Sequence, residues 1–71
     1  MVGEKLRKAR LEAGLTQEEL AFRAKISRNY VSLVELNQKS PTLEVFLRIC
    51  QAMNASAASI VAQLEGERRG K

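Results

Sequence analysis

Residues 14–36, which read GLTQEELAFRAKISRNYVSLVEL, decide the fold of this 71-residue chain. Thr16 and Glu19 have the spacing of a capping box, which predicts a helix over 17–24. Ser27, three residues beyond that helix, is a good N-cap for a second helix that ends near residue 36. Two short helices joined by three residues form the helix-turn-helix arrangement, although an ordinary corner between two bundle helices has the same spacing.

Apolar residues at helical spacing predict three more helices outside this stretch. Gly14 is expected to take the left-handed conformation that ends a helix over 3–13. Thr42 caps a helix over 43–53, and Ser56 begins a fifth helix. The inward stripe of the helix over 43–53 is expected to contain Leu43, Phe46, Leu47, Cys50 and Met53.

The predicted fold class is therefore all-α, a compact five-helix domain with the helix-turn-helix at about 17–36. We place this domain over residues 1–65, and we expect residues 66–71 to form a flexible basic tail because they show no helical periodicity. Only 4% of the residues are aromatic against 45% hydrophobic, so the core must consist of aliphatic side chains.

Several functional classes are excluded by composition. One cysteine and no histidine leave neither an internal disulfide nor a zinc site, so we expect no metal and no cofactor. Without histidine, a glycine-rich phosphate loop or an arranged carboxylate pair, we expect no enzyme. No apolar run approaches the roughly 20 residues of a membrane span, so we expect no membrane partner and a cytoplasmic protein that associates with the nucleoid.

The charged residues are unevenly distributed along the sequence. Twelve basic and eight acidic residues give a net charge of +4, which favours an anionic partner, although many inert small proteins are equally basic. Residues 1–28 hold seven basic and four acidic side chains, whereas 43–64 hold only Arg48 and Glu44.

The string Gly14-Leu15-Thr16-Gln17-Glu18-Glu19-Leu20-Ala21, followed by Ile26-Ser27-Arg28-Asn29-Tyr30-Val31-Ser32 and Glu35, resembles the lambda-repressor-like helix-turn-helix family. That family includes the phage Cro and CI repressors, the XRE-type bacterial regulators and the controller proteins of restriction–modification systems. The resemblance covers about residues 3–64 and implies that the third helix enters the major groove of double-stranded DNA.

The first turn of that third helix carries the expected base readers. Arginine can donate two hydrogen bonds to guanine, and asparagine can read adenine, so Arg28 and Asn29 are the leading candidates. Ser32 lies one turn later and can contact a base or a phosphate. Leu33 stands where relatives often have a polar reader, and it can pack on a thymine methyl or belong to a protein contact. The alternative for Arg28 is an ordinary surface charge.

The remaining expected contacts are with phosphates, which position a protein without reading sequence. Gln17 lies at the positive end of its helix, where it can bind a phosphate or remain a solvated side chain. Tyr30 can offer its hydroxyl to a phosphate, with core packing as the alternative. The resemblance implies that the loop after the third helix grips the DNA backbone, although a merely solvated loop is an alternative; its residues are Asn37, Gln38, Lys39 and Ser40.

Three other features follow from the resemblance. Arg10 and Glu35 are expected to form a partly buried ion pair that fixes the orientation of the third helix. Lys25 stands where relatives often have glycine, and a left-handed lysine costs about 1 kcal/mol. Leu36 stands where an arginine or asparagine is common, which removes one phosphate contact.

Family members usually act as two-fold dimers, so we expect a homodimer. Val61 and Leu64 are the leading interface residues, unless they close the core of the monomer. The predicted function is a transcriptional regulator that binds a pseudo-palindromic operator, either a restriction–modification controller or a phage-type repressor. The alternative is an antitoxin that binds a toxin and also its own promoter.

Overall fold

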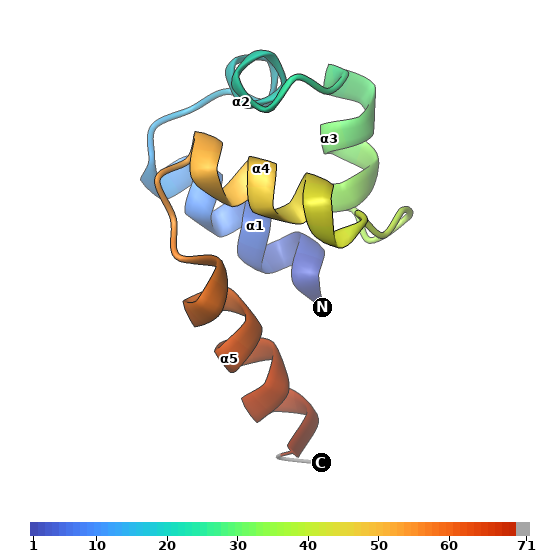
Figure 1. Cartoon of the computed structure of the whole chain (residues 1–71). Helices are drawn as coiled ribbons and strands as arrows, with labels where there is room; N and C mark the ends of the chain where they lie inside the picture. The colour runs from blue at the N-terminus through green and yellow to red at the C-terminus, as the bar shows by residue number, and fades with distance from the viewer. Residues whose placement is uncertain (70–71) are drawn as a thin grey trace.

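The computed structural model describes residues 1–69, and over these residues the chain forms five α-helices and no strand (Figure 1). The helices are α1 (Val2–Glu12), α2 (Gln17–Ala24), α3 (Arg28–Glu35), α4 (Leu43–Ala52) and α5 (Ala57–Arg69). Helix α2 packs on α3 and α4, whereas α1 packs on α3 and α5. Figure 1 shows α2 crossing above the other helices, α3 descending from it, and α5 extending away from the rest of the domain. The predicted all-α class and the predicted helices are confirmed to within one residue at most ends.

Polar side chains begin the helices as the sequence predicts. Thr16 Oγ1 accepts from the N–H of Glu19 at 3.0 Å, and the Glu19 carboxylate accepts from the N–H of Thr16 at 2.8 Å. The hydrogen bond that the carboxylate accepts from the Thr16 N–H is the main cause that lowers the pKa of the Glu19 carboxyl below its usual value. A lowered pKa means that the charged carboxylate stabilises the fold above its unfolded pKa, and this contribution is lost as the pH falls through the folded pKa. Ser27 and Thr42 cap α3 and α4 through their hydroxyl oxygens, which accept from the N–H groups of Tyr30 and Val45.

Left-handed residues end the helices. The φ angle is +74° at Gly14, +60° at Asn37 and +55° at Asn54, and all three residue types tolerate this region. Lys25 also has a positive φ of 61° at the end of α2. A side chain with a Cβ is strained in this conformation, so the expected cost of about 1 kcal/mol falls on the turn between α2 and α3.

The core is mainly aliphatic, with Leu6, Leu20, Val31, Val34 and Ile49 each no more than 2% exposed, and Phe46 is its one aromatic residue among those described as buried. Ile60 closes it from α5. The prediction for the inward stripe of α4 was wrong at two positions. Leu43 is 72% exposed and Leu47 is 48% exposed, because the buried face of α4 is formed by Phe46, Ile49 and Cys50 and these two side chains lie beside it.

The prediction of a flexible tail from residue 66 was also wrong where the structure describes it, because α5 continues through Arg69. An ion pair of 2.5 Å between Lys5 Nζ and Glu67 Oε2 holds this part of α5 to α1. Residues 70–71 of the predicted tail lie outside the described residues. No single described helix is long and apolar enough to cross a membrane; α4 and α5 reach that length and composition only as a pair, and the chain bends by 120° between them.

Candidate nucleic-acid interface

The turn between α2 and α3 is built by backbone hydrogen bonds around the left-handed Lys25. The N–H of Ile26 donates to the Ala21 carbonyl at 3.0 Å, and the N–H of Lys25 donates to the Phe22 carbonyl at 3.3 Å. This pair of bonds is the Schellman pattern, which closes a helix and redirects the chain. Ala21 is buried where α2 packs on its neighbours, and this close packing requires a small side chain. The turn therefore fixes the angle at which α3 begins.

The first turn of α3 is open to solvent. Arg28 and Asn29 are both exposed, and Ser32 is partly exposed on the following turn. Thr16, Gln17 and Glu18 line a shallow hollow of about 430 Å³ together with Arg28 and the edge of Arg10. The fold thus brings the N-terminal end of α2 beside the N-terminal end of α3, and two predicted contact residues, Gln17 and Arg28, come together there.

A buried polar network lies beneath this surface. Arg10 Nε donates to Glu35 Oε2 at 2.7 Å and Arg10 Nη2 donates to Glu35 Oε1 at 3.1 Å, so the pair is bidentate. The two side chains are 8% and 3% exposed. Arg10 Nη1 also donates to the Leu15 carbonyl at 2.8 Å. No buried side-chain nitrogen or oxygen of the described residues lacks a hydrogen-bond partner, so the network is fully satisfied.

Gln17 joins the same network. Its Nε2 donates to Glu35 Oε1 at 3.0 Å, so Glu35 connects α1, α2 and α3. This contact was not predicted, and it assigns one of the two amide hydrogens of Gln17 to the protein. The second hydrogen remains for an external anion, together with the N–H groups of Gln17 and Glu18, whereas the N–H of Glu19 is taken by the Thr16 cap.

The loop after α3 lies along the other end of the helix. Gln38, Lys39 and Ser40 are exposed, as a backbone-contacting loop requires. The Lys39 ammonium stands 5.9 Å from the centre of the Tyr30 ring, which is within the range of a cation–π contact. Tyr30 and Leu33 are both partly buried, so each side chain packs against the protein and also remains partly accessible to solvent.

Asn37 has a structural position that the sequence indicated only in part. Its left-handed backbone ends α3, with the N–H of Gln38 donating to the Leu33 carbonyl at 2.9 Å. Its side chain was expected at a phosphate, but Oδ1 accepts from the N–H of Gly3 at 2.9 Å and Nδ2 donates to Glu4 at 2.9 Å. Asn37 therefore satisfies a free donor at the start of α1 and connects that helix to the loop.

Two residues that matter for this surface were missed from the sequence. Gly3 lies against the end of α3, where a Cβ would stand 2.5 Å from the Val34 carbonyl oxygen. Arg48 donates from Nε to the Ala24 carbonyl at 3.1 Å and from Nη2 to the Lys25 carbonyl at 3.3 Å. One sequence feature could have drawn attention to Arg48: it is the only basic residue in the nearly neutral segment 43–64.

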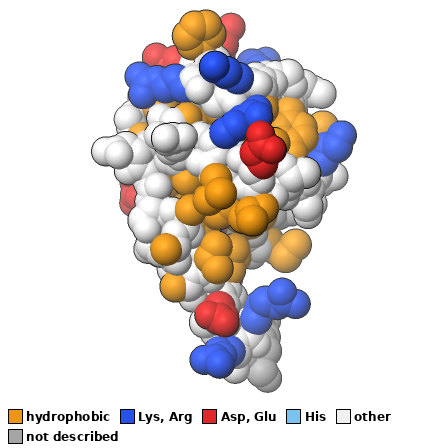
Figure 2. All heavy atoms as spheres, in the orientation of Figure 1, with side chains coloured by type: hydrophobic (Ala, Val, Ile, Leu, Met, Phe, Trp, Pro, Cys, Tyr) orange, Lys and Arg blue, Asp and Glu red, His pale blue; other side chains and the backbone are white. Residues whose placement is uncertain are grey.

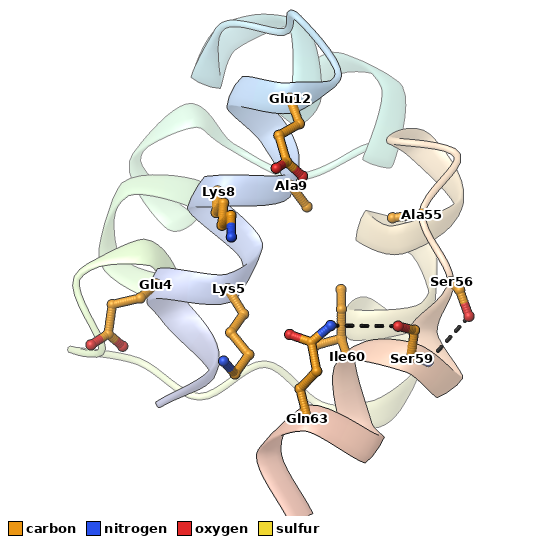
Figure 3. A pocket seen from close by; sticks show the side chains of 10 residues that line it. All are labelled: Glu4, Lys5, Lys8, Ala9, Glu12, Ala55, Ser56, Ser59, Ile60 and Gln63. Atoms are coloured by element: carbon orange, nitrogen blue, oxygen red, sulfur yellow. Dashed lines mark hydrogen bonds between the residues drawn. The ribbon is translucent and has the colours of Figure 1, made fainter. Parts of the chain in front are cut away.

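A second hollow, of about 340 Å³, lies between α1 and α5 (Figure 3). Glu4 and Glu12 lie at its edge, but they are two helical turns apart, about 12 Å along α1, and cannot act as a pair. No group of three potential metal ligands occurs within residues 1–69. Cys50 is buried, and burial raises the pKa of its thiol, so its reactive thiolate form is disfavoured.

Comparison with known proteins places this geometry among regulators. The model of the helix-turn-helix family HTH_3 matches residues 6–60. The HTH-type transcriptional regulator y4dJ of Sinorhizobium fredii is 34% identical over 86% of this chain and 79% of its own length. The transcriptional regulator ClgR of Mycobacterium tuberculosis is 35% identical over the whole chain, which spans 62% of the ClgR length.

Solved structures show the same similarity. The clp gene regulator ClgR of C. glutamicum aligns with a TM-score of 0.85 at 32% identity, over 93% of this chain and 86% of that one. The restriction–modification controller protein C.AhdI of Aeromonas hydrophila aligns with a TM-score of 0.80 at 34% identity, over 83% of this chain and 89% of its own.

Proposed function

Because the chain belongs to the helix-turn-helix family of transcriptional regulators, we propose that it binds double-stranded DNA with α3 in the major groove. The observation that carries the proposal is the open first turn of α3, held beside the start of α2 by a buried network beneath it. In this docking mode, the N-terminal end of the recognition helix faces base edges while flanking elements contact the backbone.

The side chains divide into readers and anchors. Arg28 and Asn29 have exposed donors and acceptors for base edges, and Ser32 and Leu33 extend the readable surface by one turn. The anchors are expected to bind phosphates through side chains or N–H groups at the two ends of α3. We assign this role to Gln17, Tyr30, Gln38, Lys39 and Ser40.

We propose that two copies act together on a pseudo-palindromic operator, as a restriction–modification controller or a phage-type repressor. One short α3 reads few base pairs, and a two-fold dimer doubles the site. The similarity to C.AhdI over most of both chains supports this class of small regulator. The named relatives are all regulators or controllers, which favours this function over an antitoxin that binds a toxin. For the same reason we place the chain outside the enzymes and in the cytoplasm, at the nucleoid.

The proposed dimer surface is an apolar patch on α4 and α5, where Leu43, Leu47 and Val61 are exposed and Leu64 is partly buried against the core. Figure 2 shows apolar side chains gathered where these helices meet. Leu43, Val61 and Leu64 line a hollow of about 250 Å³ together with Val2 and Pro41, which a side chain from a second copy can fill. A contiguous exposed apolar surface of this kind is typical of a protein–protein contact.

Val61→Glu is expected to weaken dimerisation. Val61 is 49% exposed, so burying the remaining half contributes about 0.7 kcal/mol in each of two symmetric copies, and the dimer Kd should rise at least about tenfold. Analytical ultracentrifugation measures this change. Leu11→Glu is the control, because Leu11 is 52% exposed on α1 and outside the patch. An unchanged Kd for Val61→Glu, or an equal loss for Leu11→Glu, would place the interface elsewhere.

The proposed DNA contacts are tested by selecting binding sequences from random DNA and measuring two variants on them. Arg28→Ala should cost about 1–3 kcal/mol on the selected site and remove the preference at one base position. Lys39→Ala should weaken all sequences alike and reduce the slope of log K against log salt by about one. If the parent shows no sequence preference, the proposed function is wrong; if both variants bind as the parent does, the residue roles are wrong.

A further inference from the structure

The guanidinium of Arg48 holds the C-terminal end of α2 from a different helix. It donates to the carbonyls of Ala24 and Lys25, which are 24 and 23 residues away in the sequence. The last carbonyls of a helix have no partner within it, and a cation at this end also complements the helix dipole. Arg48 therefore binds two carbonyls of the turn, in addition to the backbone hydrogen bonds that Ala21 and Phe22 accept there.

The turn needs such support because of Lys25. Its left-handed backbone is strained, and the turn contains only three residues between the two helices. The carbonyl that Arg48 Nη2 binds belongs to Lys25 itself. Arg48 projects from α4, whose Phe46, Ile49 and Cys50 are buried in the core, so its base is rigid.

The consequence concerns the residues immediately after the turn. Arg28 follows Lys25 by three positions, and base readout requires its guanidinium to be aligned with the edge of one base pair. We propose that Arg48 is a positioning residue for sequence recognition: by fixing the turn, it sets the direction in which α3 presents Arg28 and Asn29. This inference rests on the proposed function, since it concerns the same DNA-binding surface.

The chain offers a matched control for charge. Arg23 lines the same hollow as Arg48, together with Lys25 and Gln51, and no hydrogen bond joins it to the turn among the described residues. Removing Arg23 therefore removes a neighbouring positive charge and leaves the hydrogen bonds from Arg48 to the turn in place. Arg48→Met keeps most of the apolar length of the side chain and removes its donors, and Arg23→Met makes the same change at the control position.

The experiment measures the ratio of affinities for the selected site and for unrelated DNA, at a temperature where circular dichroism shows each variant to be folded. Arg48→Met is expected to lower this ratio about tenfold, because the readers lose alignment while phosphate contacts persist. Arg23→Met is expected to weaken both affinities together and leave the ratio unchanged. A residue that only stabilised the fold would lower the melting temperature without changing the ratio for the folded protein.

Arg48→Lys gives a second measurement if the methionine variant does not fold. Lysine keeps the charge and can reach one carbonyl, but it lacks the two separated donors of arginine. The ratio should therefore fall by about threefold. An unchanged ratio for Arg48→Lys or for a folded Arg48→Met, with the parent still selective, would overturn the positioning role alone. A parent without selectivity would overturn the proposed function as well.

Discussion

Arg10→Met is expected to lower the free energy of unfolding by about 3–5 kcal/mol. The variant would leave the carboxylate of Glu35, which is 3% exposed, with Gln17 as its one remaining donor in the network. The Leu15 carbonyl would lose its bond from Arg10 as well. A domain of this size has a total stability of about 5–15 kcal/mol, so much of it would disappear. Urea denaturation followed by circular dichroism measures the change.

Two further variants distinguish the effect of an uncompensated buried charge from the effect of losing an exposed ion pair. Glu44→Gln removes an acid that is 82% exposed and lies 3.7 Å from Arg48, and it should change the stability by less than about 1 kcal/mol. The double variant Arg10→Met/Glu35→Leu should lose less free energy of unfolding than Arg10→Met alone, because no uncompensated charge is then buried. If Arg10→Met cost no more than Glu44→Gln, the network would not stabilise the fold as described.

Gly3→Ala is expected to destabilise the protein by about 3 kcal/mol. An added Cβ would stand 2.5 Å from the Val34 carbonyl oxygen and 2.6 Å from both the Glu35 carbonyl oxygen and Asn37 Oδ1. Two of these atoms belong to the backbone of α3, so relief requires α1 and α3 to separate. Separation would also break the hydrogen bond from the N–H of Gly3 to Asn37. Thermal unfolding measures the loss.

Gly66→Ala is the control for the same chemical change. Gly66 lies inside α5, and no described neighbouring atom comes within 4 Å of the position of its Cβ. Alanine should stabilise this site by about 0.5–1 kcal/mol, since it forms helices better than glycine. The two variants should therefore change stability in opposite directions. A gain in stability for Gly3→Ala would contradict the close packing of α1 on α3.

The helices and the open surface were predictable because their signals are local. Thr16, Ser27 and Thr42 bind N–H groups three residues away, so a cap is visible in any short window of sequence. The ends of α3 and the exposure of Arg28 could therefore be predicted from short segments of sequence. The contact between Arg10 and Glu35 spans 25 residues, and the resemblance to a known family was needed to predict it.

The remaining features depend on how the helices are placed in space. The apolar spacing of Leu43 and Leu47 equals that of a buried stripe, and the packing of Phe46, Ile49 and Cys50 into the core leaves them exposed. The close approach at Gly3 and the bonds from Arg48 to the turn join residues 23 or more positions apart. Glu67 keeps the end of α5 on α1 through Lys5, which a scan for periodicity along one helix does not detect.

The network around Glu35 has a consequence for how the chain meets DNA. One carboxylate accepts from α1 and α2 while it belongs to α3, so the three helices are fixed relative to one another before a duplex arrives. The conformational entropy of arranging them is lost during folding and not during association. Adaptation to an imperfect site then falls on the side chains of α3, on the exposed loop and on the shape of the DNA.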